Sequence, residues 1–417
     1  MRKFATVVTI LAALVGGAAA RAADKPCDRA CLEDLVGKYL TALAAHDASK
    51  LPLGKTFGFV ENDQPLKLGQ GTWVSVSALG SYRHVFADPE DGTAAVITTV
   101  TENGKGAILD LVLKVQNRQI VEAESQIIRD PNGAALYEKM GAPAPEWLQA
   151  VPPAERMSRA DVIATADKYL VGMIRDDPKG DYSFFDPECD RIEHALKTTN
   201  VKTPQAYGHS SDFDFSSMGC EAQYKTGFLG FVTDIRDRRF PVVDVERQAA
   251  FAFADLDHNG TVRVLHLSTG KDFVIPAYFD VPRTLQAGEA YRMRNGKIWR
   301  IEMTLTELPY GMRPAGAVAP PSAPVPPPKP VKGQPPACDR ACLQDLLVQV
   351  LQAIADHRPA EAPLAANVRY TENGQALKLG DGVWNTATAV AMPGVPFSLV
   401  EQRHAAWPLK GSARNSL

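Results

Sequence analysis

The sequence predicts an α+β protein built from tandem modules, in each of which helices come first and a curved antiparallel sheet comes last. Two observations support this fold class. A segment near the N-terminus is repeated near the C-terminus. In addition, both long globular segments begin with an amphipathic helix and end with strand-like stretches joined by an Asn-Gly turn, which is typical of β-hairpins.

The internal repeat is the clearest feature of the chain. Residues 27–80 align without gaps with residues 338–391, and about 24 of the 54 positions are identical. The segment CDRACLEDLVGKYLTALAAHD corresponds to CDRACLQDLLVQVLQAIADHR, and Trp73 corresponds to Trp384. A match of this length indicates a duplicated module. We expect both tryptophans to lie in the core.

The first module is predicted to span residues 27–130. Apolar residues recur at helical spacing from Leu32 to Ala45, which predicts an amphipathic helix. Three β-rich stretches follow, and Asn103-Gly104 separates the first two. These stretches are residues 94–101, 107–115 and 120–128.

The second module is predicted to span residues 155–313. Residues 158–161 resemble a capping box, and the helix they open continues to about Ile174. A long irregular stretch follows, and Asn295-Gly296 marks a hairpin near the end. The predicted strands are residues 242–256, 262–268, 289–294 and 297–308.

The remainder of the chain is a spacer and an incomplete copy. Prolines at almost every second or third position predict an extended linker over residues 314–337. Residues 338–417, the tail copy, keep the helix and the tryptophan segment of the first module but lack its meander. Truncation or a frameshift is the simplest explanation, and pairing with another chain is the alternative.

The N-terminus predicts export. Arg2 and Lys3 precede a short apolar run, and Ala20-Arg21-Ala22 fits a cleavage site, so residues 1–22 are expected to be a signal peptide. The alternative is a membrane anchor. No later segment approaches the length of a membrane span, so we expect no stable membrane insertion after cleavage and a periplasmic or secreted location. The net charge of -3 and the lack of a basic stripe argue against nucleic acid as a partner.

The six cysteines are expected to form disulfides, because an even number in an exported chain suggests pairing. Cys27 and Cys31 stand four residues apart, as do Cys338 and Cys342, and a helix brings such positions within disulfide reach. A metal site at either pair would need ligands that the nearby sequence lacks. Elimination then pairs Cys189 with Cys220, although the sequence alone leaves the connectivity open.

Several segments resemble a known family. The segments ENDQPLKLGQGTW, RRFPVVDVERQAAFAF and EAYRMRNGKIWRIEMTLTELPYGM look like those of DUF8021 proteins, and the resemblance runs from Cys27 to about Arg313. The helix-first plan resembles the NTF2-like superfamily, which includes SnoaL-like cyclases and ketosteroid isomerases. This resemblance implies cone-shaped modules whose cavity combines an acid with His, Tyr or Arg. It names no reaction, because this fold carries many functions.

Three residues are candidates for acid–base catalysis. Asp190 and His194 follow Cys189, whose disulfide would fix them, and histidine has the intrinsic pKa best suited to proton transfer. Asp244 stands two residues from Glu246, so on a strand the two carboxylates would share a face. The alternatives are that DRIEH is a solvated helix start and that the two carboxylates are surface charges.

Four residues are candidates for binding a ligand. Arg191 and Arg239 could hold an anionic group, and Glu307 and Tyr310 end the last predicted strand, where a cone would open. The arginines could instead be exposed or paired structurally, and Tyr310 could simply plug the end of the sheet.

Other polar groups on the predicted strands are assigned by alternation. Glu289, Tyr291 and Met293 share one face of a strand, whereas the face with Glu302 and Thr304 is expected to lie in solvent. Residues 255–260 begin like a calcium loop, but a hairpin turn fits the flanking strands better. Residues 208–212 group Ser, His and Asp without implying a triad.

Together these features predict an exported protein that binds a small organic molecule in the second module. It would isomerise, dehydrate or hydrolyse this molecule by acid–base chemistry without a metal or cofactor. The alternative is a non-catalytic ligand-binding or interaction module outside the cytoplasm. The sequence leaves the choice between them open, as it does the substrate, the reaction and self-association into a homo-oligomer.

Overall fold

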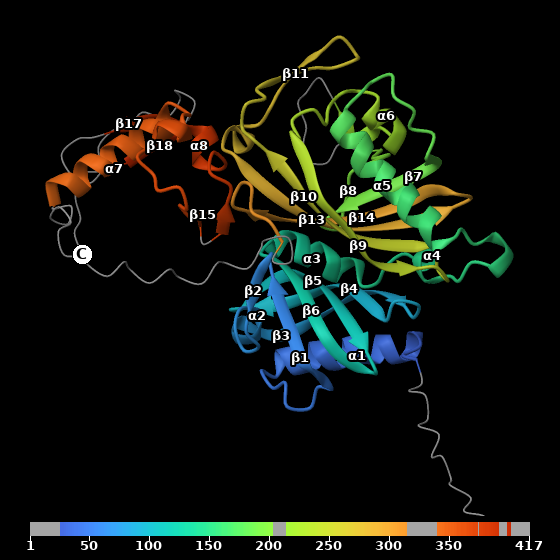
Figure 1. Ribbon diagram of the computed structural model, residues 1–417. Coiled ribbons are helices and arrows are strands. Elements are labelled where there is room, and N and C mark those ends of the chain that lie inside the picture. Colours follow the sequence, from blue (N-terminus) through green and yellow to red (C-terminus); the bar gives the residue numbers. More distant parts are fainter. Residues whose placement is uncertain (1–25, 203–213, 315–339, 374, 392–397, 402–417) are drawn as a thin grey trace, which may run out of the picture.

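The computed structural model describes residues 26–202, 214–314, 340–373, 375–391 and 398–401 (Figure 1). The predicted signal peptide, the proline-rich linker, the Ser-His-Asp segment 208–212 and Cys338 lie outside these residues. The described part is an α+β protein with two six-stranded sheets, each preceded by a long helix. Within it, no helix is long and apolar enough to cross a membrane.

The first module is built on the sheet with strand order β2-β1-β6-β5-β4-β3. Its long helix begins at Asp28, whose side chain accepts a hydrogen bond from the Cys31 backbone N–H at 3.0 Å. Three predicted strands are confirmed within a few residues, and β1, β2 and β3 are additional. The elements are α1 (Arg29–Ala44), β1 (Leu53–Glu61), β2 (Gln64–Leu66), α2 (Thr72–Ser75), β3 (Val76–Asp88), β4 (Thr93–Glu102), β5 (Lys105–Gln116), β6 (Gln119–Ile128), α3 (Pro131–Met140) and α4 (Pro145–Leu148).

The second module repeats this order in the sheet β8-β7-β14-β13-β10-β9. The predicted cap is confirmed, because the Ser158 hydroxyl accepts a hydrogen bond from the Asp161 backbone N–H. The elements are α5 (Arg159–Arg175), β7 (Phe185–Glu193), β8 (Leu196–Lys197), α6 (Cys220–Tyr224), β9 (Asp234–Asp244), β10 (Ala249–His258), β11 (Val264–His266), β12 (Asp272–Val274), β13 (Arg283–Arg294) and β14 (Lys297–Leu308).

Each sheet is mixed rather than purely antiparallel. The first strand of each module pairs in parallel with the last one, β1 with β6 and β7 with β14, whereas the other strand pairs are antiparallel. Two strands that pair in parallel are not joined by a tight turn, so the sequence carries no turn signal for them. The expectation of a purely antiparallel sheet was therefore wrong for the pairs β1–β6 and β7–β14.

Three details of the predicted second module are wrong. Residues 242–256 are not one strand, because residues 245–248 turn the chain from β9 into β10 and Gln248 has a φ of 50°. DRIEH is the end of strand β7 rather than a helix start. The chain after Gly260 does not return along β10, because β11 pairs with β12 in a separate ribbon.

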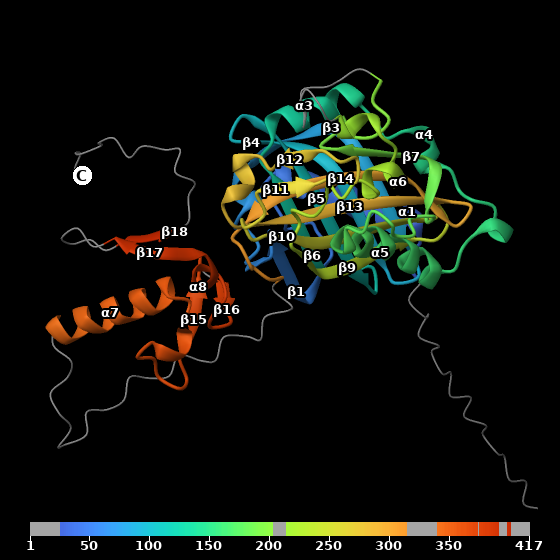
Figure 2. The same ribbon diagram turned by 90° about the horizontal axis from the view of Figure 1, so that it is seen from above.

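The two sheets lie face to face, and the surface between them is here called the seam (Figures 1 and 2). α1 covers the far face of the first sheet and α5 covers the far face of the second, which gives four layers. The seam has an apolar core from both modules and from α3 and α4, which includes Phe86, Ile97, Val112, Phe251 and Phe253. The two modules therefore form one packed body.

Two disulfides are confirmed among the described residues. Cys27 and Cys31 are bonded across the first turn of α1. Cys189 on β7 is bonded to Cys220 at the start of α6. The predicted pairing of Cys338 with Cys342 stays a prediction. These disulfides are compatible with a protein outside the cytoplasm.

The tail copy repeats the start of the first module. Its elements are α7 (Arg340–Ala355), β15 (Tyr370–Glu372), β16 (Gln375–Leu377), α8 (Val383–Thr386), β17 (Ala387–Ala391) and β18 (Ser398–Glu401). Two contacts recur. His46 and His357 each place Nδ1 against a tryptophan backbone oxygen, and Glu61 and Glu372 each accept the backbone N–H that opens the following short helix. Both tryptophans are buried, as predicted.

The tail helix shows what its missing sheet would cover. Leu343 and Leu347 are 58% and 44% exposed, whereas the corresponding Leu32 and Val36 of α1 are 0% and 1% exposed. Among the described tail residues, β17 pairs with the short strand β18 in the place of β4, and no counterparts of β5 and β6 follow. The sequence observation that the copy lacks its meander agrees with this exposed stripe.

Candidate functional site

The predicted acid–base residues do not share one cavity: His194 and Asp244 lie at contacts between the modules, and Asp190 lies on the second module alone. His194 is held at both ring nitrogens: Nδ1 lies 2.7 Å from an Asp130 carboxylate oxygen, and Nε2 accepts the Leu305 backbone N–H at 2.9 Å. The hydrogen bond from His194 is the main cause that lowers the pKa of Asp130, which burial opposes. Asp190 is half-buried and pairs with Lys197 at 3.0 Å.

Asp244 has a similar linking position. Arg29 of α1 makes two hydrogen bonds to its carboxylate, at 2.9 and 2.6 Å, and a third to Glu246 at 2.7 Å. Asp244 and Glu246 therefore do share a partner, but that partner is the first module. This arrangement uses the carboxylates to hold α1 against the turn between β9 and β10.

The predicted ligand-binding residues also divide among several places. Arg239 forms a two-point pair with Glu124 across the seam, with both distances 2.7 Å. Glu307 accepts hydrogen bonds from Arg283 and Tyr278. Glu307 and Tyr310 line a groove of about 510 Å³ at the end of β14, together with Glu372 of the tail copy. Arg191 alone lies in the interior of the second module.

The structure brings Arg191 together with a buried polar cluster beneath α5, here called the acid cluster. Arg191 is 3% exposed, and its guanidinium donates to the Tyr169 hydroxyl at 3.2 Å and to the Gln223 side-chain oxygen at 2.7 Å. On β13, the Tyr291 hydroxyl donates to Glu289 at 2.6 Å. α5 supplies Tyr169, α6 supplies Gln223, and the sheet supplies the rest.

Glu289 is the most unusual group in this cluster. Its side chain is 1% exposed, and one carboxylate oxygen, Oε1, is buried without a hydrogen-bond partner. Burial raises the pKa of Glu289 to about 8, and the Tyr291 hydrogen bond and the Arg191 charge only partly offset this rise. At neutral pH the side chain is therefore mostly a neutral acid next to two tyrosines, and mild alkali would convert it to a base.

The two tyrosines next to Glu289 are also held in their neutral forms. Burial raises the pKa of Tyr291 far above its usual range, and the neighbouring Glu289 raises it further. Tyr169 behaves in the same way, although the Arg191 charge lowers its pKa. Both hydroxyls therefore keep their protons and can donate hydrogen bonds to an oxygen that gains negative charge.

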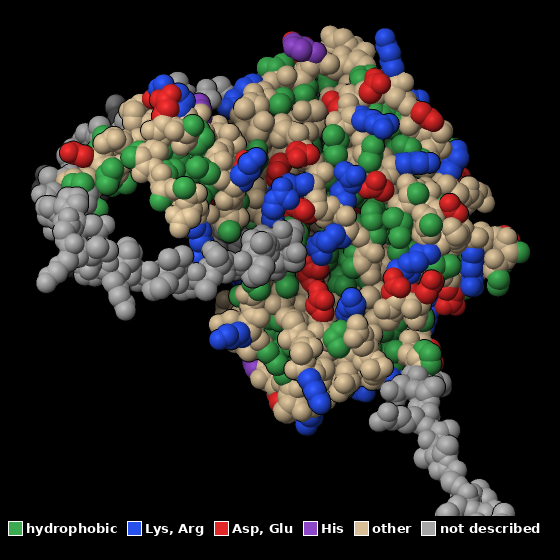
Figure 3. Space-filling model, in the orientation of Figure 1, with side chains coloured by type: hydrophobic (Ala, Val, Ile, Leu, Met, Phe, Trp, Pro, Cys, Tyr) green, Lys and Arg blue, Asp and Glu red, His purple; other side chains and the backbone are tan. Residues whose placement is uncertain are grey.

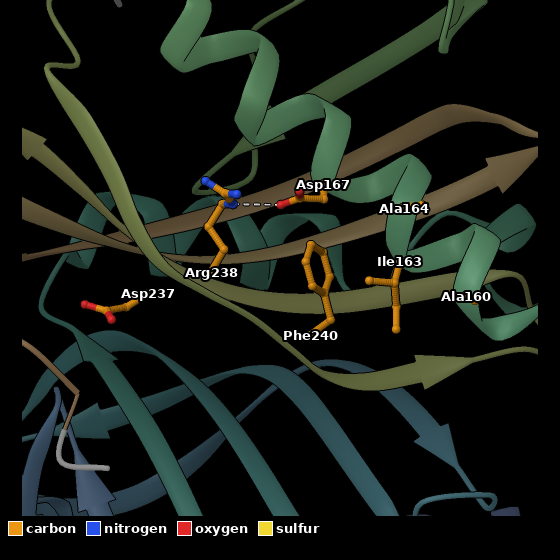
Figure 4. A pocket seen from close by; sticks show the side chains of 7 residues that line it. All are labelled: Ala160, Ile163, Ala164, Asp167, Asp237, Arg238 and Phe240. Atoms are coloured by element: carbon orange, nitrogen blue, oxygen red, sulfur yellow. Dashed lines mark hydrogen bonds and ion pairs between the residues drawn. The ribbon is translucent and has the colours of Figure 1, made fainter. Parts of the chain in front are cut away.

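A groove of about 650 Å³ lies between strand β9 and α5, the helix that also carries Tyr169 of the acid cluster (Figure 4). It is open to solvent, because Ala160 and Ala164 in its lining are exposed. Phe240 forms its floor and packs against the core that contains Tyr169 and Tyr291. Ala252, the β10 partner of Glu289, lies beside the β9 irregularity at Phe240. The lining residues are Ala160, Ile163, Ala164, Asp167, Asp237, Arg238 and Phe240.

A second set of buried polar groups crosses the seam. Glu302 is 1% exposed and accepts hydrogen bonds from Tyr82 at 2.8 Å and His84 at 2.7 Å. Thr304 donates to Asp110, whose pKa burial raises to about 8. The expectation that the Glu302 and Thr304 face lies in solvent was therefore wrong, because the first sheet covers it.

The sequence noted the central residues of the acid cluster without selecting them. The strand pattern predicts that Glu289 and Tyr291 share a face, but it does not select either of them as a site residue. The sequence signal that could have identified Glu289 is that it is the only acid on a strand face whose other residues are Ala287, Tyr291 and Met293. Asp190 and His194 were selected for their residue types and for their nearness to Cys189, and neither reason requires them to lie in a cavity.

Two further features of the described residues are their metal-ligating groups and their surface charge. Among the described residues, no three His, Cys, Asp or Glu side chains are grouped so that they could hold a metal ion. On the face in Figure 3, basic and acidic side chains are interspersed, and neither sign dominates.

Comparison with known proteins gives a family for one part of the chain. Residues 155–305 match the family described as "Domain of unknown function (DUF8021)". The match supports the predicted family for the second module, which holds the acid cluster and the groove. A search of curated proteins found no match.

Among solved structures, one similar chain is AclR of Streptomyces galilaeus, a suggested hydroxylase. It is 17% identical, and the alignment covers 30% of this chain and 92% of AclR, with a TM-score of 0.21. A designed protein with a curved β-sheet is 15% identical, with 36% and 88% of the two chains covered and a TM-score of 0.20. These scores are too low to bear on fold or function.

Proposed function

We propose that the second module binds a small organic molecule and transfers a proton to or from it through Glu289. The observation that carries this proposal is the fully buried Glu289 with one unpartnered oxygen, flanked by two protonated tyrosines. An acid whose pKa lies near the working pH can both accept and donate a proton. Isomerisation, dehydration and hydrolysis of a small molecule can all use such a group.

The proposal includes the fold family and the location. The helix-first order, the shared strand order of the two sheets and the helix over one face of each support an NTF2-like plan in tandem. The two disulfides support a periplasmic or secreted protein with a cleaved signal peptide. In this plan, the face of the sheet beneath the helix holds the ligand.

The groove supplies the route to Glu289. Only β10 separates β9, which carries Phe240, from β13, which carries Glu289, and two strand spacings amount to about 10 Å. On β10 the intervening residue is Ala252, which fills little space. A flat ligand that displaces the Phe240 side chain would therefore approach the unpartnered carboxylate oxygen.

Proton transfer can be tested with 2-tetralone, a bicyclic ketone with acidic protons next to its carbonyl. The measurement is the rate at which these protons exchange with D2O, followed by NMR. We expect the protein to accelerate exchange, with a rate that rises with pH towards a plateau above about 8, because the carboxylate form acts as the base. Glu289→Gln should reduce the acceleration by roughly 100-fold or more.

The matched control is Glu61→Gln. Glu61 is one of the buried glutamates of the first module, it is 7% exposed, and it accepts hydrogen bonds from Thr72. This variant should exchange 2-tetralone as fast as the wild type. Equal rates for Glu289→Gln and the wild type would exclude Glu289 as the base. Binding of 2-tetralone without any acceleration would favour the alternative, a non-catalytic binding module.

A further inference from the structure

The groove between α5 and β9 contains one cation with unused hydrogen-bonding capacity. Arg238 donates through Nε to Asp167 at 2.7 Å and through Nη1 to the Ile235 backbone oxygen at 3.3 Å. Among the described residues, no group accepts from its Nη2. The side chain is 32% exposed, so solvent reaches part of the guanidinium group.

The two acids of the groove are already engaged. Asp167 holds Arg238, as Figure 4 shows. Asp237 accepts from Arg236 at 2.8 Å and lies 3.4 Å from Arg313. Both carboxylates therefore already have a cationic partner. Arg238 in turn keeps N–H donors without an acceptor among the described residues, and an anion is the ligand that these donors can hold.

The rest of the lining is apolar. Ala160, Ile163 and Ala164 form the α5 wall, and the Phe240 ring stands opposite them (Figure 4). A wall of small side chains facing an aromatic ring suits a flat hydrocarbon body. The ion pair lies beyond the ring, towards one end of the groove.

We infer that the groove binds a flat apolar molecule that ends in a carboxylate, with the carboxylate on Arg238 and the ring system over Phe240. This inference rests on the proposed function and names the substrate class for the same site. Guanidinium groups bind carboxylates through paired N–H donors. A carboxylate ligand would therefore gain charge-assisted hydrogen bonds that a neutral amide would not form. With its carboxylate at Arg238, the ligand stacks on the Phe240 ring, and displacement of that ring is the step that would bring its body across β10 to Ala252 and Glu289.

The test compares three probes with one ring system: 2-naphthoate, 2-naphthamide and 2-naphthylmethylamine. Calorimetric titration of the full chain should show the tightest binding for naphthoate. Arg238→Gln should weaken naphthoate binding about tenfold, the size of one charge-assisted contact, and leave naphthamide unchanged. Asp167→Asn should tighten naphthoate binding several-fold, because it releases the Nε donor.

Two further variants control for folding and for position. Arg175→Gln removes a charge from the same helix outside the groove lining, and it should leave all three affinities unchanged. Ala164 is exposed on α5, so Ala164→Phe should fill the groove and weaken naphthoate and naphthamide alike without disturbing the core. Thermal unfolding followed by circular dichroism checks that each variant is folded.

The inference and the proposed function fail separately. Equal affinity for naphthoate and naphthamide, an unchanged affinity in Arg238→Gln, or no naphthoate binding at millimolar concentration would overturn the carboxylate assignment. Glu289→Gln should still bind naphthoate while losing proton exchange. If the wild type binds naphthoate as expected but does not accelerate proton exchange in 2-tetralone, only the proton-transfer proposal is overturned.

Discussion

The first and second modules share one strand order but fill the space under their long helices differently. The hairpin turns align β5 with β13, so Leu111 occupies the place of Glu289, and Leu113 that of Tyr291. The pairing with the next strand gives the same alignment. Leu111 pairs with Ser125 and Glu289 pairs with Met303, and each partner lies eight residues after the first residue of its hairpin turn. The first module is apolar here, whereas the second carries an acid and two tyrosine hydroxyls.

This difference indicates a division of labour. In the first module, α1 packs Leu32, Leu40 and Leu43 onto the sheet, and the Tyr39 hydroxyl accepts the Trp73 indole N–H. Such a core contributes stability through buried apolar surface. In the second module the same place holds groups that are costly to bury, which proteins retain mainly for function.

The largest effect should come from giving the first module the acid of the second. Leu111 is fully buried, and the residues around it supply no hydroxyl in the place of Tyr291. Leu111→Glu should therefore destabilise the protein by roughly 4 kcal/mol, the scale of an uncompensated buried charge. Denaturant unfolding measures the loss, with Leu111→Met as the volume-matched control. A loss below about 1 kcal/mol would mean that the two faces are equivalent.

A smaller effect should appear in the pH dependence of stability. Because the pKa of Glu289 rises from 4.5 to about 8 on folding, the folded state holds its proton more tightly than the unfolded state. Its contribution is therefore fully present below pH 4.5 and is lost as the pH rises through about 8. Between pH 6 and pH 9 the wild type should lose roughly 3 kcal/mol more than Glu289→Gln.

Denaturant unfolding at several pH values measures this difference. Asp110 and Asp255 also have pKa values that burial raises to about 8, so the wild type and Glu289→Gln share a background of alkaline destabilisation. Only the difference between the two proteins reports on Glu289. Parallel pH profiles would show that Glu289 ionises normally in the folded state.

Much of the fold could be predicted from the sequence, because local signals mark it. The N-cap residue Ser158 predicts the start of α5, and Asn295-Gly296 predicts the turn of the β13–β14 hairpin. Strand β7 was missed because Arg191 occupies a buried position, which breaks the apolar alternation. The seam was missed for a similar reason: Glu302 and Thr304 look like solvent-facing residues until a second sheet covers them.

The site was harder to predict than the fold. Asp190, His194 and Asp244 have the residue types that acid–base chemistry uses, but their partners come from distant segments. Asp130 holds His194, and Arg29 holds Asp244. No local pattern encodes such pairs. Burial, not residue type, distinguishes Glu289, and burial depends on how α5 lies on the sheet.

The smallest effect concerns the seam, where the modules meet through their equivalent strands. Gly288 on β13 lies so close to Asp110 on β5 that an added Cβ atom would stand within 3.0 Å of the Asp110 side chain. Gly288→Ala should therefore force the two sheets apart locally and cost roughly 1–2 kcal/mol in the free energy of unfolding.

The matched substitution is Gly37→Ala in α1. Nothing lies within 4 Å of an added Cβ there, and alanine favours the helix, so this variant should gain about 1 kcal/mol. Equal and opposite shifts in thermal unfolding would show that the close approach at Gly288 is a property of the seam. If Gly288→Ala instead stabilises the protein as Gly37→Ala does, the modules are packed less closely than their buried polar contacts indicate.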